Sequence, residues 1–295
     1  MERFGLNTHF SIMEFQWYPG HMTKAKRQMQ EDIKLIDLVI EVIDARCPVA
    51  SRNPDINDLA KNKLRLVLLN KADLADEKSN NRWIEYFVAQ GFYAVGLDSR
   101  NRKNMKDVQA TLDRVCAAKF EKDRARGIKN RPVRAMVLVI PNVVKSTVMN
   151  AFAGKAGAKT GNKPGVTKGK QWIKLNKAVE LLDTPGILWP KFEDNKVGLN
   201  LAFIGSINDA IIETRELSIE LIKFLCDKYP KYLNDRYQID VNKECYDILV
   251  DIAASRNFVK KGGELDYDKA AYTLIDEFRS GTLGRITLEL PEQDN

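Results

Sequence analysis

The chain of 295 residues is 44% hydrophobic and 29% charged, which is typical of a soluble globular protein with two domains. No apolar run approaches the roughly 18 residues that a membrane-spanning helix needs. The four cysteines lie far apart and the chain has only two histidines, so the sequence lacks the paired ligand spacing that is typical of a zinc site. Because the first residues, MERFGLNTHFSI, lack the features of a signal peptide, we expect a cytoplasmic protein.

Charge is divided unevenly along the chain. Residues 206–295 hold 12 of the 47 lysines and arginines and 18 of the 40 aspartates and glutamates, so residues 1–205 keep 35 basic against 22 acidic side chains. The basic residues are densest in KFEKDRARGIKNRPVR and KTGNKPGVTKGKQWIK. An excess of this size favours a polyanionic partner such as RNA, although a solvated surface explains any single run equally well.

Apolar runs that end at polar turns predict buried strands over 36–44, 64–70, 133–140 and 178–183. Between them, residues 80–90 and 104–120 carry apolar side chains at helical spacing. This alternation predicts an α/β fold with a mostly parallel sheet and helices on both faces. In such sheets, ligands bind beyond the carboxyl ends of the strands.

The pattern becomes helical after about residue 205. Cys245, Ile248, Leu249 and Ile252 form one helical stripe. The stretch DYDKAAYTLIDEFRSGTLG predicts a second helix, with aspartates as N-cap candidates and glycines as stop signals. We therefore expect a small, acidic, mostly helical C-terminal domain.

The stretch LLNKADL places Asn70, Lys71, Ala72 and Asp73 directly after a predicted strand. In a guanine site, an aspartate carboxylate accepts hydrogen bonds from the N1 and exocyclic amino groups of the base, and adenine offers no such pair of donors. The asparagine helps to hold the base and the phosphate loop, while the lysine stem packs over the ring. The alternative is an ordinary polar turn between a strand and a helix.

A second strand ends in the stretch LLDTPGI. Asp183 there is a candidate magnesium ligand through water, and Gly186 gives a main-chain N–H room to approach a γ-phosphate. Taken alone, Asp-Thr-Pro-Gly is a common turn sequence. Together with Asn-Lys-Ala-Asp, it indicates a nucleotide site.

The stretch VLVIPNVVKSTVMNAF has the layout of a phosphate-binding P-loop between a strand and a helix. Alignment on Lys145 and Ser146 puts Val139 and Val144 where that motif has its two glycines. Holding a valine in a left-handed conformation costs about 1–3 kcal/mol. A free-energy change of about 1.4 kcal/mol corresponds to a tenfold change in affinity. We therefore expect the two valines to weaken phosphate binding by a factor of about ten to several tens.

The order of these motifs, with Asn-Lys-Ala-Asp before the phosphate loop, resembles that of the circularly permuted GTPases. The resemblance rests also on FQWYPGHMTKAKRQM, DARCPVASRNP, PNVVKST, KPGVT and LLDTPGILWPKFED, and it extends from about Phe15 to near the C-terminus. It implies a flexible N-terminal extension over 1–14, a permuted P-loop GTPase domain over 15–205, and a helical RNA- or ribosome-binding domain over 206–295. Residues 1–12 have no family counterpart, so Met13 is an alternative start to Met1.

The resemblance also implies site residues. Those for GTP are Asn70, Lys71, Ala72, Asp73, Asp98, Ser99, Asn142, Val143, Val144, Lys145, Ser146, Thr147 and Gly186. Those for Mg²⁺ are Ser146, Thr167 and Asp183. Asn142 matches an asparagine that binds a monovalent cation in potassium-stimulated members, which makes K⁺ a further candidate ion.

The resemblance further offers a catalytic residue. Many GTPases orient the attacking water with a glutamine after the Asp-x-x-Gly motif, and this chain has Ile187 there. The histidine of PGHM, His21, is the candidate that the resemblance supplies instead. An N-cap or buried helix-start histidine is the alternative interpretation of His21.

Two functions follow as expectations. The first is an enzyme that hydrolyses GTP to GDP and phosphate in late assembly of the large ribosomal subunit, bound to the subunit precursor and its rRNA and not to DNA. The second is a pseudo-GTPase that binds rRNA without turnover because of Val139 and Val144. A small-molecule kinase is disfavoured, since Asn-Lys-Ala-Asp would have no role in it. Candidate RNA contacts in the C-terminal domain are Lys260, Lys261, Arg279 and Arg285.

Overall fold

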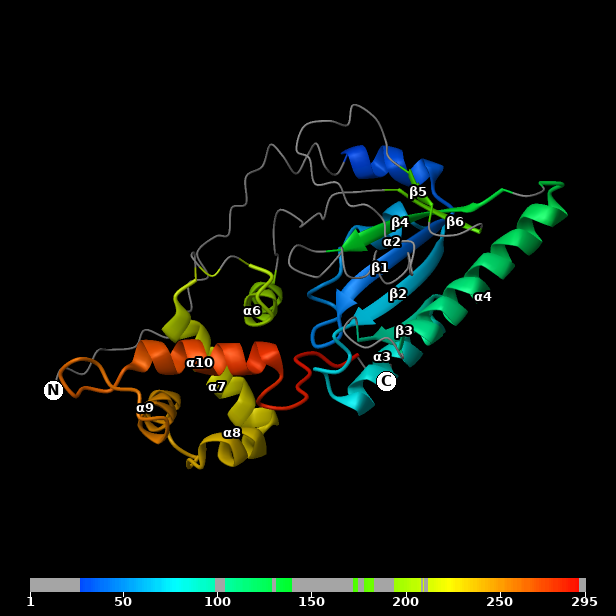
Figure 1. The fold of residues 1–295 in the computed structure, drawn as a ribbon. Helices are drawn as coiled ribbons and strands as arrows, with labels where there is room; N and C mark the ends of the chain where they lie inside the picture. The colour runs from blue at the N-terminus through cyan, green and yellow to red at the C-terminus, as the bar shows by residue number, and fades with distance from the viewer. Residues whose placement is uncertain are drawn as a thin grey trace. The chain divides into compact units, whose positions relative to one another are not determined.

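The computed structural model describes residues 27–98, 104–128, 131–139, 172–174, 178–182, 194–207, 209 and 212–291 (Figure 1). These residues divide into two compact units. We call residues 27–182 with 284–291 the sheet unit and residues 194–283 the helical unit. Among the described residues, none of the helices is long and apolar enough to span a bilayer.

A six-stranded sheet forms the centre of the sheet unit, in the order β3-β2-β1-β4-β6-β5. Its strands are β1 Leu38–Asp44, β2 Leu64–Asn70, β3 Tyr93–Leu97, β4 Val133–Val139, β5 Trp172–Lys174 and β6 Val179–Leu182. All neighbouring strands run parallel except β5, which is antiparallel to β6. Every residue of β1 is buried, as expected for the centre of a parallel sheet that is covered on both faces.

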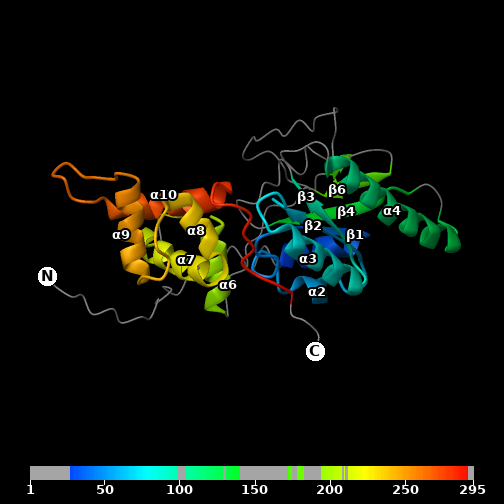
Figure 2. The ribbon, with the colours of Figure 1, turned by 90° about the horizontal axis from the view of Figure 1, so that it is seen from below.

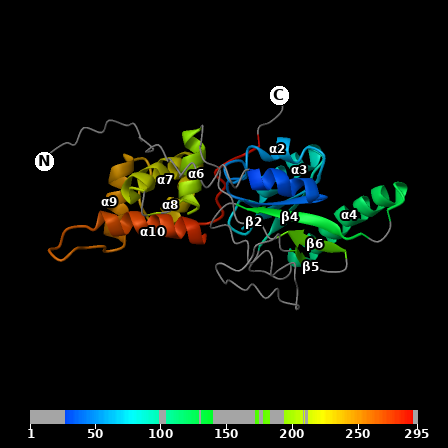
Figure 3. The same cartoon turned by 90° about the horizontal axis from the view of Figure 1, so that it is seen from above.

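Helices cover both faces of this sheet, as the sequence predicts (Figures 2 and 3). One face packs against the helical residues 27–32, η1 Ile33–Leu35, α2 Ile56–Leu59 and α3 Glu77–Ala89. The other carries α4 Asn104–Ala125.

Helix α3 shows how its sequence sets its position. Asp76 caps its first turn by accepting a hydrogen bond from the main-chain N–H of Ser79 at 2.8 Å. Trp83 and Phe87, one helical turn apart, are each 1% exposed and stack with ring centres 5.8 Å apart. Burying two such aromatic side chains stabilises the helix on the sheet by roughly 1.5–3 kcal/mol each.

The helical unit contains α6 Asn195–Phe203, α7 Thr214–Lys228, α8 Pro230–Tyr237, α9 Cys245–Ser255 and α10 Tyr267–Ser280. The predicted cap and stop of α10 are confirmed. Asp266 accepts a hydrogen bond from Lys269 N at 3.1 Å, and Gly281 ends the helix with a φ of 82°. That left-handed conformation favours glycine.

The division between the units differs from the predicted one at 205/206. Helix α6 belongs to the helical unit because Phe203 packs on Phe278, and the Arg279 guanidinium donates to the carbonyls of Phe203 and Ala202 at 3.0 and 2.8 Å. At the other end, residues 284–291 leave the helical unit and pack within the sheet unit. Neither exchange is visible in local sequence pattern, since each depends on contacts between residues far apart in the chain.

Candidate functional site

Polar residues gather where β1, β2 and β3 end. Asp44 pairs with Asn70 in the sheet register, and Asn70 pairs with Leu97, so that Asp98 follows at the same edge. Two main-chain hydrogen bonds extend this register into the loops, from Ala45 N to Asn70 O at 2.8 Å and from Ala72 N to Leu97 O at 3.2 Å. Three separate segments thus meet at the edge where α/β sheets bind ligands.

Lys71 turns the chain at the end of β2. Its φ is 57°, a left-handed conformation that costs a non-glycine residue about 1–3 kcal/mol. Its ammonium group lies 3.2 Å from Asp44 Oδ2, and its carbonyl accepts a hydrogen bond from Leu74 N at 2.9 Å. The side chain is thereby held across the end of β1, and the turn that carries Asp73 is closed.

Asn70 has an amide that the described part of the chain leaves unpaired. The residue is fully buried, and neither Oδ1 nor Nδ2 has a hydrogen-bond partner among the described residues. A buried polar group left in this state costs about 1–3 kcal/mol. The amide therefore fits a site that is completed by a group offering both a donor and an acceptor.

Ala72 and Asp73 lie in a loop that is tied down on both sides. The Ala72 carbonyl accepts a hydrogen bond from Asn80 Nδ2 of α3 at 2.8 Å. A Cβ atom placed on Gly96 of β3 would lie 3.4 Å from the Ala72 Cβ, so Gly96 permits the loop to approach the strand closely. Asp73 and Asp98 are both partly exposed as residues, while Oδ1 of Asp73 is buried.

Asp44 and Arg46 form a buried ion pair beneath this loop. Arg46 Nε and Nη2 each lie 2.9 Å from one Asp44 oxygen, and the Arg46 main-chain N–H also donates to Oδ1 at 3.0 Å. The side chains are 1% and 0% exposed. Arg46 also interacts electrostatically with Asp73. Asp44 and Arg46 therefore join Lys71 and Asp73 in one charged network.

The pKa of Asp44 reflects this arrangement. Burial alone would raise the pKa of the carboxyl above its ordinary value of 3.8, but the charge and hydrogen bonds of Arg46, with the charge of Lys71, lower it to about 2. Asp44 is thus a fixed anion at neutral pH. The sequence stretch DARCPVASRNP contains both residues, but sequence reasoning gave neither a role in the site.

Many predicted site residues lie outside the described residues. They are His21, Ser99, Asn142, Val143, Val144, Lys145, Ser146, Thr147, Thr167, Asp183 and Gly186. Val139 is described, and it is the last residue of β4, paired with Val42 of β1 and 7% exposed. Because Val139 lies in an extended strand, the loss of the first glycine of the motif brings no left-handed strain at this position.

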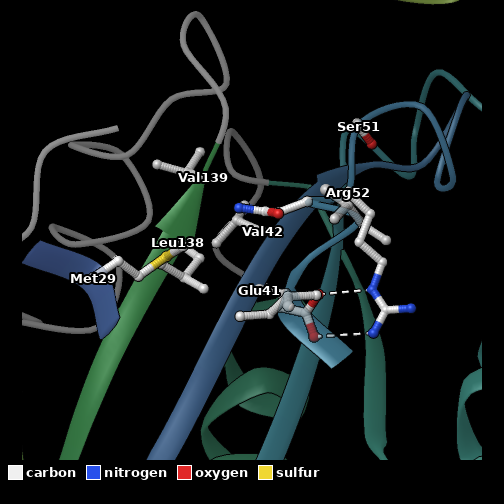
Figure 4. A pocket seen from close by; sticks show the side chains of 10 residues that line it. Met29, Glu41, Val42, Ser51, Arg52, Leu138 and Val139 are labelled. Atoms are coloured by element: carbon white, nitrogen blue, oxygen red, sulfur yellow. Dashed lines mark hydrogen bonds and ion pairs between the residues drawn. The ribbon is translucent and has the colours of Figure 1, made fainter. Parts of the chain in front are cut away.

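A small pocket lies beside Val139, between the ends of β1 and β4 (Figure 4). Met29, Val42 and Leu138 give it apolar walls. Glu41 and Arg52 also line the pocket, and the Glu41 carboxylate accepts a hydrogen bond from Arg52 Nε at 2.7 Å and another from Arg65 Nε at 2.9 Å. With a cavity volume of about 20 Å³ it has room for about one water molecule, so it is too small for a nucleotide.

Comparison with known proteins gives concordant results. The protein family described as "50S ribosome-binding GTPase" matches residues 134–254. The chain is 45% identical to ribosome biogenesis GTPase A of Bacillus cereus over 95% of each chain, and 44% identical to that of Priestia megaterium over 95% of this chain and 98% of the relative. A crystal structure of GNP-bound YlqF from T. maritima matches with a TM-score of 0.64 and 28% identity, over 92% of this chain and 99% of the other.

Proposed function

Because the chain belongs to the ribosome biogenesis GTPase A family, we propose that its base site lies at the carboxyl ends of β1, β2 and β3. The protein is a circularly permuted GTPase that hydrolyses GTP and acts in ribosome biogenesis. The observation that supports the proposal best is the buried amide of Asn70, which has no hydrogen-bond partner among the described residues and ends β2 three residues before Asp73.

Each residue of the loop has a distinct task in this proposal. The Asp73 carboxylate accepts hydrogen bonds from N1–H and the 2-amino group of guanine, and the stem of Lys71 packs over the ring. The Asn70 amide links the base loop to the phosphate loop, which supplies the missing donor and acceptor. Asp98 and Ser99 support the base from the end of β3. Asp44 holds the Lys71 ammonium group at 3.2 Å, which keeps the stem in place before the base arrives.

The proposed phosphate loop follows β4 in the sequence, and β4 pairs with β1 in the sheet. Val139 pairs with Val42, two residues before Asp44, so the described end of β4 lies beside the strand that leads to the base site, although β4 comes later in the chain. The permuted order of the motifs therefore gives a contiguous site. Gly186 completes it near the γ-phosphate.

Magnesium binding is proposed for Ser146, Thr167 and Asp183. Two hydroxyl groups and a carboxylate are oxygen ligands of the kind that Mg²⁺ prefers. When bound, Mg²⁺ neutralises the charge that develops on the β- and γ-phosphates. Asn142 is the proposed contact for K⁺, and His21 is the proposed residue that orients the attacking water in place of the usual glutamine.

The proposed partner is a precursor of the large ribosomal subunit, through its rRNA, in the cytoplasm. The excess of 35 basic over 22 acidic residues in 1–205 supports this, since phosphate contacts dominate RNA affinity. Lys261 is exposed. Lys260 is 46% exposed, and its Nζ lies 3.4 Å from Oδ2 of Asp268. Arg279 is excluded from the proposed contacts because it holds the carbonyls of α6, and Arg285 lies in the sheet unit within 3.5 Å of Glu77.

Replacement of Asp73 by asparagine tests the base site. Xanthine has a carbonyl where guanine has its 2-amino group, so an asparagine amide pairs with xanthine better than a carboxylate does. In Asp73→Asn we expect GTP affinity to fall at least tenfold and XTP affinity to rise, as measured by displacement of a fluorescent nucleotide. Asp107→Asn, an exposed change on α4, is the matched control. If Asp73→Asn leaves both affinities unchanged, the guanine site lies elsewhere.

The two valines of the phosphate loop are tested separately. Val139→Gly should leave GTP affinity within about threefold, since Val139 already sits in a strand, whereas Val144→Gly should raise it about tenfold or more. Fluorescent GTP titration and phosphate release measure both effects. If the unaltered protein neither binds nor hydrolyses GTP and both abilities return only with Val144→Gly, this chain is a pseudo-GTPase.

A further inference from the structure

The last described part of the chain packs against the loops of the base site. We call residues 285–289 the C-terminal strap. Three of its side chains are buried, with Ile286, Thr287 and Leu288 1%, 4% and 6% exposed. The strap has no regular secondary structure, so its main-chain groups are available to bond to other segments.

The strap holds two loops through the main chain. Ile286 N donates to the carbonyl of Leu74 at 3.0 Å, and Leu288 N donates to the carbonyl of Arg46 at 2.7 Å. Leu74 directly follows Asp73, and Arg46 is the partner of Asp44. Alternate strap residues therefore bond to the loop after β2 and to the loop after β1.

Side chains of the strap add further bonds. Thr287 Oγ1 accepts a hydrogen bond from Asp76 N, the cap of α3, at 3.0 Å. The Glu289 carboxylate accepts from Val49 N at 2.7 Å and from Ala50 N at 3.1 Å. The Glu289 carbonyl accepts from Trp83 Nε1 at 3.0 Å. The strap is thus hydrogen-bonded to the loop after β1, to the loop after β2 and to α3.

These bonds fall where the base site needs support. At the strand ends the two loops are joined by the Lys71–Asp44 pair and by the hydrogen bond from Ala45 to Asn70. Both contacts involve residues that come before Asp73 in the sequence, namely Asn70 and Lys71. The strap bonds lie after it, at Leu74 and Asp76. Recognition of a base by a carboxylate requires placement within about 0.5 Å, and the strap adds its bonds to the Leu74–Lys71 hydrogen bond that closes the turn around Asp73.

We propose that the C-terminal strap is a positioning element for guanine recognition, which sets the orientation of the Asp73 carboxylate by fixing the main chain on its far side. The inference rests on the proposed function, since it assumes that Asp73 binds the base. Thr287 acts as a positioning residue and touches neither nucleotide nor phosphate.

Thr287→Val tests the strap because it removes the acceptor for Asp76 N and keeps the side-chain shape. We expect GDP and GTP affinities to fall by the same factor, about three- to tenfold. We also expect the preference for GDP over IDP to narrow, because inosine lacks the 2-amino donor and reports on the second hydrogen bond to Asp73. The turnover rate at saturating GTP should not change.

Thr111→Val is the matched control, since Thr111 is 3% exposed on α4 and its hydroxyl accepts a hydrogen bond from Arg114 Nη2 at 3.0 Å. It should lower the melting temperature without changing nucleotide preference. In an Asp73→Asn background, Thr287→Val should no longer alter the GDP-to-IDP ratio. If Thr287→Val lowers the melting temperature but keeps the ratio, the strap only stabilises the fold and the inference is wrong. If the unaltered protein has no guanine preference, the proposed function itself fails.

Discussion

Two aspartates, one in each unit, have pKa values lowered from 3.8 to about 2, but their surroundings differ. Asp44 of the sheet unit is fully buried against Arg46. Asp268 of the helical unit is 57% exposed, and its pKa is lowered chiefly by the hydrogen bond from Arg215, with a further one from Lys260, against the opposing effect of burial. The same pKa thus describes a charge fixed inside a site and a charge paired on a surface.

The difference matters for stability. Removing one partner of a buried pair leaves an uncompensated charge in the interior, whereas a surface pair is screened by salt and contributes little. The comparison therefore predicts that stability and nucleotide binding depend on Asp44 far more than on Asp268.

Asp44→Asn should give the largest effect. It leaves Arg46 buried without its anion and frees the Lys71 ammonium group, so we expect a loss of about 3–5 kcal/mol in the free energy of unfolding. Urea unfolding measures this. The double variant Asp44→Asn/Arg46→Met should recover much of the loss, because no lone charge remains. A loss below about 1 kcal/mol in the single variant would contradict the role of the buried pair.

Acid should separate the two carboxylates by their response to salt. The folded-state pKa of Asp44 lies below its ordinary value, so its contribution is complete above about pH 5 and is lost as the pH falls through 3.8 towards 2. We expect about 2 kcal/mol of acid-dependent stability from Asp44, still present in 1 M salt. The measurement is urea unfolding between pH 5 and 2.5 at both salt concentrations, with Asp44→Asn as the reference. Complete loss of this dependence in high salt would argue against a buried pair.

Asp268→Asn should give the smallest effect. We expect a change in the free energy of unfolding of about 0–1 kcal/mol at low salt that shrinks as salt is added, because Asp268 and Arg215 are both exposed. Guanine nucleotide affinity should be unchanged. A loss as large as that of Asp44→Asn would remove the distinction between the two pairs.

The sequence predicted the strands that are long and buried. The runs at 36–44, 64–70, 133–140 and 178–183 correspond to β1, β2, β4 and β6. Strand β3 was missed because YAVGL is short, mostly half-buried and contains alanine and glycine, which are weak strand formers. Strand β5 has only three residues, too few for a period to be recognised.

The candidate site was also predictable in part, where its residues are neighbours in the sequence. Asn70, Lys71 and Asp73 form a contiguous motif after a strand, and the structure brings them to the edge of the sheet. The roles of Asp44 and Arg46 depend on Lys71, which follows the neighbouring strand β2, so no local pattern reveals them. The strap was assigned to the helical domain because nothing in its own composition indicates that it returns to the sheet.

The bonds of the strap also bear on the order of folding. Glu289 and Val49 are 240 residues apart in sequence, Thr287 and Asp76 are 211 apart, and Glu289 and Trp83 are 206 apart. Contacts that close such long loops form late, since the entropy of the whole intervening chain is lost before the contacts are gained. Since β1 to β3 are synthesised before α10 and the strap after it, the proposed base site would lack its strap bonds throughout the elongation of a nascent chain. Tight guanine binding at the proposed base site would then begin only once the helical unit has emerged and the strap that follows it has joined the sheet.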